Sequence, residues 1–150
     1  MYMCQWIVLC ENVIHDSQTN CLTLVNALTE VRATGLPALH TRFAFAVLLR
    51  RDDAARGALS LRLLRITDAG EEVVVNIVGR EPPPRVQFYM NFPLGIRLFS
   101  LGPVRFRVDV REGDEDWYPV ATQELQVIAL EGSPLAEQGE TTPPDEEAKA

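Results

Sequence analysis

The chain has 150 residues, of which 47% are hydrophobic and 23% are charged. This composition is typical of one ordinary globular domain and excludes a wholly disordered chain, a collagen and a disulfide-dense miniprotein. The longest apolar runs fall short of the roughly 18 residues that a membrane-spanning helix needs, so we expect no membrane segment.

The net charge of −7 is unevenly distributed along the sequence. Residues 131–150 hold six acidic residues against Lys149, whereas the first 130 residues hold 15 acidic residues against 13 arginines. The first 130 residues are therefore nearly neutral, and we expect no nucleic-acid partner because such binders carry a strongly basic surface. The three cysteines Cys4, Cys10 and Cys21 form an odd set without a signal peptide, which predicts a cytoplasmic protein with free thiols.

The first half of the chain predicts four strands. Met3–Cys10 is a mostly apolar run followed by a polar turn. Leu22–Val31 fits both an alternating pattern and a helical stripe, and its threonines favour a strand. His40–Arg50 is apolar on both faces, which predicts a strand in the middle of a sheet, and Leu59–Ile66 alternates leucines with polar residues.

The second half predicts four more strands. Glu72–Val78 is rich in valine and follows a tight turn, and Val86–Phe92 follows three prolines that indicate a crossover between sheets. Val104–Arg111 has the clearest alternation of the chain, with valine and phenylalanine on one face and charged residues on the other. Trp117–Leu130 is the last predicted strand.

This pattern predicts an all-β fold. We expect an antiparallel two-sheet β-sandwich, immunoglobulin-like in architecture, with about eight strands in residues 1–130. Residues 131–150 lack aromatic and β-branched aliphatic residues, so they are predicted to form a disordered acidic tail.

Several segments resemble a family of small bacterial all-β proteins of unknown function. They include Leu22–Val31, the Phe43–Leu49 strand, the crossover at 91–94 and the run of residues 102–110 with its glycine, aromatic residue and acidic strand end. The likeness covers roughly residues 3–130. It implies a cytoplasmic β-sandwich and supplies no catalytic residue.

No catalytic motif is recognisable in the sequence. There is no phosphate-binding loop, no G-x-S-x-G and neither an H-E-x-x-H nor a C-x-x-C pattern. We therefore predict a non-enzymatic interaction or scaffold module without a cofactor or catalytic residue. Its expected partner is another protein or a second copy of the chain.

The segment 88–101 is unusually rich in large apolar residues. Part of it could form an exposed partner surface, because exposed apolar patches mark interaction sites, or it could cover the edge of the core. The candidates for a partner surface are Phe88, Tyr89, Met90, Phe92, Leu94, Ile96 and Phe99.

Two further patterns support an alternative function in ion binding. Arginines on two predicted strands could form one basic face for an anion or could simply pair with nearby acids. Acidic residues at a predicted hairpin tip could bind a metal ion weakly or could form a solvated turn. The anion-binding candidates are Arg62, Arg65, Arg105, Arg107 and Arg111, and the metal candidates are Asp114, Glu115 and Asp116.

Overall fold

The computed structural model describes residues 1–51, 53, 57–80 and 85–138. Within these residues the chain forms eleven strands and one short helix. In chain order they are β1 (Met3–Asp16), β2 (Cys21–Ala27), β3 (Glu30–Ala33), β4 (Ala38–His40), β5 (Phe43–Arg50), β6 (Leu59–Thr67), β7 (Gly70–Arg80), β8 (Arg85–Phe92), β9 (Ile96–Leu98), β10 (Gly102–Glu112), β11 (Tyr118–Ala129) and α1 (Pro134–Gln138). The predicted all-β class is confirmed.

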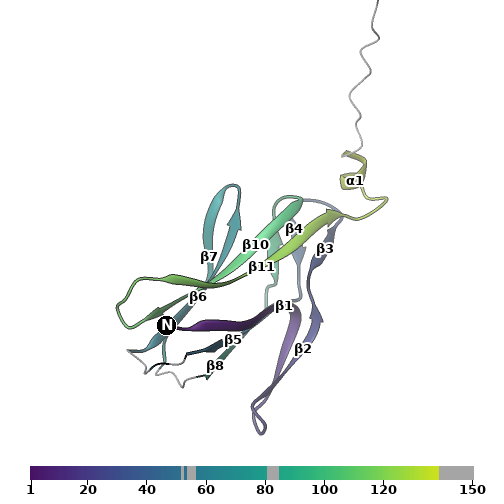
Figure 1. Ribbon diagram of the computed structural model, residues 1–150. Coiled ribbons are helices and arrows are strands. Elements are labelled where there is room, and N and C mark those ends of the chain that lie inside the picture. The colour runs from purple at the N-terminus through teal and green to yellow at the C-terminus, as the bar shows by residue number, and fades with distance from the viewer. Residues whose placement is uncertain (52, 54–56, 81–84, 139–150) are drawn as a thin grey trace, which may run out of the picture.

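In the described part of the chain the strands form three sheets (Figure 1). A four-stranded sheet has the order β2-β1-β5-β8, a five-stranded sheet has the order β3-β11-β10-β6-β7, and β4 pairs with β9 alone. All of these pairs are antiparallel except β3 and β11, which are parallel. The expected count of about eight strands in two antiparallel sheets is therefore not confirmed.

One difference arises in the segment that was predicted as the single strand Leu22–Val31. The chain leaves the four-stranded sheet after β2 and enters the five-stranded sheet as β3. Asn26 adopts a left-handed backbone with φ of 51°, which asparagine tolerates better than most residues. Beyond it the Leu28 amide donates to the Leu9 carbonyl, whereas the Thr29 carbonyl accepts from Gln126 of β11.

The two larger sheets share one core. Their inner faces are lined by Phe43, Phe45 and Val47 of β5, and Phe106 of β10 lies with its ring centre 5.3 Å from that of Phe43. β5 is buried on both faces, as its two apolar faces predicted. The short pair β4–β9 adds Ile96 and Leu98 to this core, although no strand was predicted over these residues.

The outer face of β5 carries the small residues Ala44 and Ala46, and the β1–β2 hairpin crosses this face. The Asn91 side chain of β8 accepts a hydrogen bond from the Val13 amide at 2.8 Å and donates one to the Val13 carbonyl at 2.9 Å. Val13 packs with both alanines in a second apolar cluster. Because alanine is small, the hairpin can pass close over β5 and reach β8.

The structure differs from the predicted disordered tail over residues 131–138. Ser133 is buried, its hydroxyl accepts a hydrogen bond from the Ala136 amide at the start of α1, and Leu135 packs against the core. The rest of the predicted tail, 139–150, lies outside the described residues. No helix among the described residues has the length and apolar character needed to cross a membrane.

Candidate functional site

The structure divides the predicted partner surface among three environments. Phe88 and Ile96 are core residues, so their prediction as surface residues is wrong. Met90 and Phe92 are half-buried and pack against the core. The exposed candidates are Tyr89, Leu94 and Phe99. The segment 88–101 therefore mostly completes the core, because alternate residues of β8 and β9 point inward.

The predicted arginine face is present with one exception. Arg62 lies opposite Asp109 in the register of β6 and β10, on the outer face of the five-stranded sheet. Arg65 lies opposite the buried Phe106 and belongs to the inner face. Its prediction as part of the outer basic face is wrong, because two strand residues three positions apart point to opposite faces.

Acidic residues neutralise much of this face. Arg62 donates two hydrogen bonds to one oxygen of the buried Asp109, at 3.0 and 2.9 Å. Arg107 donates to Asp109 at 2.7 Å and to Glu71 at 2.8 Å, and these hydrogen bonds raise the pKa of Arg107. Two of the predicted anion-binding arginines thus share one buried carboxylate.

The remaining outer arginines have different surroundings. Two guanidinium groups lie over the Trp117 ring, that of Arg62 at 4.6 Å and that of Arg111 at 4.8 Å from the ring centre. Arg105 is exposed, and no carboxylate forms an ion pair with it among the described residues. Anion binding at this face stays a prediction.

The acidic tip does not gather metal ligands in the described part of the chain. Asp114, Glu115 and Asp116 are exposed, and no three acidic, histidine or cysteine side chains there lie close enough to hold a metal ion. Glu112, which precedes them, is instead buried in a polar cluster.

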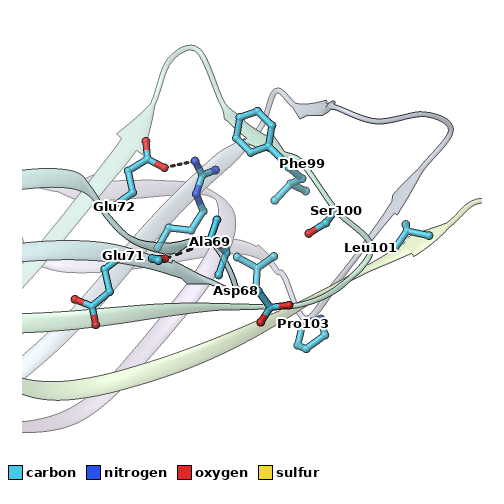
Figure 2. Close-up of a pocket in the computed structure, with 13 residues that line it drawn as sticks. Asp68, Ala69, Glu71, Glu72, Phe99, Ser100, Leu101 and Pro103 are labelled. Atoms are coloured by element: carbon cyan, nitrogen blue, oxygen red, sulfur yellow. Dashed lines mark hydrogen bonds and ion pairs between the residues drawn. The ribbon is translucent and has the colours of Figure 1, made fainter.

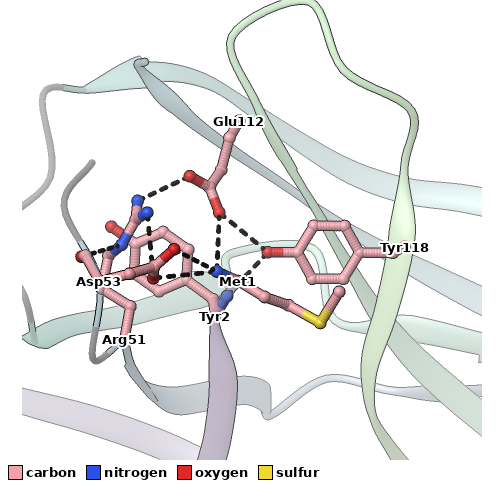
Figure 3. Close-up of polar contacts among 6 residues, drawn as sticks. All are labelled: Met1, Tyr2, Arg51, Asp53, Glu112 and Tyr118. Atoms are coloured by element: carbon pink, nitrogen blue, oxygen red, sulfur yellow. Dashed lines mark hydrogen bonds and ion pairs between the residues drawn. The ribbon is translucent and has the colours of Figure 1, made fainter. Parts of the chain in front are cut away.

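That polar cluster, here called the Arg51–Glu112 cluster, comprises Tyr2, Arg51, Asp53, Glu112 and Tyr118 (Figure 3). Arg51 donates to Glu112 at 2.6 Å, and its guanidinium lies 4.9 Å from the centre of the Tyr2 ring. The Tyr118 hydroxyl accepts from the Tyr2 amide at 2.9 Å and donates to Glu112 at 3.2 Å. Burial raises the pKa of Tyr118. The cluster joins the start of β1 to the ends of β5 and β10.

The three cysteines differ in their exposure to solvent. Cys4 is half-buried, Cys10 is buried and Cys21 is exposed. Burial raises the pKa of the Cys4 and Cys10 thiols, although a backbone hydrogen bond opposes the shift in each. Both thiols are therefore less prone to form the reactive thiolate than an exposed cysteine.

An open cleft of about 560 Å³ lies where the β6–β7 turn faces the connection from β9 to β10 (Figure 2). Figure 2 shows Glu71 and Glu72 on one side and Phe99, Ser100 and Leu101 on the other. We call this site the β7 cleft. Its lining residues are Arg65, 67–72, 98–101, Pro103 and Val104.

The two sides of the β7 cleft differ in chemistry. Phe99 and Leu101 are 59% and 44% exposed, and below them Leu98 and Val104 belong to the buried core. Three acidic residues also line the cleft, Asp68, Glu71 and Glu72, although the Glu71 carboxylate is bonded to Arg107 of the outer sheet face. The cleft thus combines an apolar wall with an acidic wall.

Arg65 connects the two walls. Its guanidinium donates to the Glu72 carboxylate and to the Arg97 carbonyl, and it lies 5.2 Å from the centre of the Phe99 ring. Glu71 accepts two hydrogen bonds from Arg107. Asp68 has no ion-pair partner among the residues that the structure describes.

The β7 cleft adjoins a free sheet edge. Within the described residues no strand pairs with the outer edge of β7, which is 11 residues long. The other edge strands of the two large sheets, β2, β8 and β3, have 7, 8 and 4 residues. Val73 and Val78 of β7 are 50% and 70% exposed.

The sequence prediction missed the β7 cleft because its parts lie about 30 residues apart. Residues 68–70 were interpreted only as a turn, and the segment 88–101 was interpreted as a partner surface or a cover of the core edge, so the two were not connected. The available signal was the pair of large apolar residues, Phe99 and Leu101, in a segment too short to bury both.

A family model described as a family of unknown function, DUF6941, matches residues 5–141. The chain belongs to this family. The match includes β7, the β7 cleft and most of the Arg51–Glu112 cluster, and it confirms the expected resemblance to a family of unknown function. A search of curated proteins gives no match.

Proposed function

We propose that the protein is a non-enzymatic interaction module that binds an extended segment of a partner protein as an additional strand beside β7. One observation carries this proposal. Gly70, Glu71 and Glu72 begin the unpaired edge strand and also line the β7 cleft. A partner strand along this edge would therefore pass an open site for its side chains.

The character of the edge supports strand addition. An edge strand presents unpaired amide and carbonyl groups, and proteins usually protect such edges with short length, proline or charge. β7 is long, and residues 73–78 contain no charge and no proline. Strand addition uses the backbone groups for affinity and side-chain pockets for specificity.

The proposal treats the two larger sheets as an immunoglobulin-like sandwich that holds β7 in place. It also places the module in a reducing cytoplasm, for which the free cysteines Cys4, Cys10 and Cys21 are the supporting feature. Neither point is needed for strand addition.

The test is a selection from a displayed library of random peptides against the full chain, followed by affinity measurement. We expect selected peptides to bind wild type and to lose about tenfold in affinity on Val78→Lys, because lysine at an edge opposes strand pairing. Leu94→Lys is the matched control, since Leu94 is 84% exposed and lies outside β7 and the β7 cleft.

Three outcomes would overturn the proposal. They are the absence of any selected binder, equal binding by the Val78→Lys variant, and equal loss in the Leu94→Lys control. A wild-type dimer that dissociates on Val78→Lys would assign the edge to a second copy of the chain instead.

A further inference from the structure

We infer that the β7 cleft binds an arginine or lysine side chain of the segment that pairs with β7. This inference rests on the proposed function, because strand addition beside β7 is what brings the side chain to the cleft. The cleft itself supplies the reasons for its chemistry: its size, its charge and its aromatic wall.

The size of the cleft suits a side chain together with neighbouring atoms of its own segment. Its volume of about 560 Å³ lies within the range of about 300–1,000 Å³ that is common for ligand pockets. Its floor is preformed, because Leu98 and Val104 are 1% and 4% exposed.

The charge of the lining favours a cation. The lining includes the carboxylates of Asp68, Glu71 and Glu72 and the single guanidinium of Arg65. Glu72 pairs with Arg65, and Glu71 pairs with Arg107 outside the lining. Arg65 is already held by Glu72 and by the Arg97 carbonyl, so it has little capacity left for an anionic ligand. The carboxylate of Asp68 has no ion-pair partner among the described residues. A basic ligand therefore gains favourable interactions, and an acidic ligand is repelled.

The apolar wall explains why the cation should be a side chain rather than a free ion. Phe99 is 59% exposed, and the centre of its ring lies 5.2 Å from the Arg65 guanidinium carbon. Arginine and lysine carry an aliphatic stem that packs on apolar surface and a charged head that stays near carboxylates or aromatic rings. This combination matches the apolar and acidic walls of the cleft.

The experiment uses small probes that cannot form a strand. Nα-acetyl-arginine amide is titrated into the ¹⁵N-labelled full chain, and backbone amide signals are followed by NMR. Nα-acetyl-citrulline amide is the matched neutral probe. We expect saturable shifts for residues 67–72 and 98–101 with the arginine probe and much smaller shifts with the citrulline probe.

The variants assign the effect to the β7 cleft. Asp68→Asn should lower the affinity for the arginine probe by up to about fivefold, which is the range for an exposed charge pair. Asp114→Asn is the matched control, because Asp114 is an exposed acid outside the cleft. The amide spectrum of each variant also reports whether it is folded.

The inference is overturned if both probes bind with the same affinity or if no saturable shift occurs at the cleft. It is also overturned if Asp114→Asn lowers the affinity for the arginine probe as much as Asp68→Asn does. Failure of the proposed function looks different. In that case the arginine probe still binds and the Val78→Lys variant binds it normally, but no selected peptide depends on Val78. Conversely, Val78-dependent peptides without a basic residue would overturn only the inference.

Discussion

The Arg51–Glu112 cluster and the β7 cleft contain the same grouping of side chains. In each, an arginine lies over an aromatic ring and donates to a glutamate: Arg51 with Tyr2 and Glu112, and Arg65 with Phe99 and Glu72. They differ in the exposure of the carboxylate, because the Glu112 side chain is 3% exposed and that of Glu72 is 63% exposed.

This difference in burial is the basis for assigning a structural role to the first site and the proposed binding role to the second. In the Arg51–Glu112 cluster, Glu112 accepts from both Arg51 and Tyr118 and is closed to solvent. In the β7 cleft, Phe99 and the Glu72 carboxylate are mostly exposed to solvent. The same residue types are therefore enclosed in the fold at one site and exposed at the other, where we propose recognition.

The largest predicted effect is at Glu112. Glu112→Gln should lower the free energy of unfolding by about 3–5 kcal/mol, because it removes the buried carboxylate that pairs with the buried Arg51 guanidinium at 2.6 Å, and the Asp53 carboxylate that also pairs with Arg51 is about half exposed. Urea denaturation measures this loss. A loss below about 1 kcal/mol would mean that the buried pair is not structural.

A smaller loss is expected for Tyr118→Phe. The change removes the acceptor of the Tyr2 amide and one donor to Glu112, and an unsatisfied buried amide costs about 1–3 kcal/mol. The same denaturation measurement applies. Tyr89→Phe is the matched control, because Tyr89 is 37% exposed and its hydroxyl can bond to water; it should change stability little.

The stability of wild type should also depend on alkaline pH. Burial raises the pKa of Tyr2 and Tyr118 above the ordinary value of 10.0, so the folded state keeps their protons while the unfolded chain loses them. Their contribution is complete below pH 10 and is lost as pH rises toward the folded pKa. Each tyrosine adds a slope of at most about 1.4 kcal/mol per pH unit.

The pH experiment compares the unfolding free energy of wild type and Tyr118→Phe at several pH values between 9 and 11. We expect a shallower decline in the variant, since it lacks one of the two tyrosines whose pKa is raised. Parallel curves would contradict the assignment of this dependence to Tyr118.

The smallest effect is expected at Glu72. Glu72→Gln should cost less than about 1 kcal/mol, because ion pairs with an exposed member contribute little to stability. The loss of unfolding free energy measured by urea denaturation should therefore be clearly smaller for Glu72→Gln than for Glu112→Gln. Equal losses would remove the distinction between the two sites.

Alternation predicted the parts of the fold in which one strand stays in one sheet. The Phe43–Leu49 segment lies in the middle of a sheet, and Val104, Phe106 and Val108 face the core, as expected. The change of sheet near Leu28 was missed because Leu22, Leu24 and Leu28 fit one continuous strand. The buried residues of β3, Val31 and Ala33, follow in the opposite phase of the alternation.

The candidate site was harder to predict than the fold because it depends on distant segments. The burial of Glu112 requires Arg51 and Tyr118 beside it, and its charged surroundings in the sequence indicated an exposed turn. The β7 cleft requires residues near 68 and near 99 to face each other. Local patterns contain neither pairing.

Hydrogen–deuterium exchange of the β7 amides, with and without a peptide selected from the library, tests strand addition most directly. Slower exchange in residues 70–78 on peptide binding, with the edge strand β8 unchanged, is the expected result, because new backbone hydrogen bonds protect the amides of the paired edge. A bound peptide that leaves the exchange of residues 70–78 unchanged would contradict strand addition at β7.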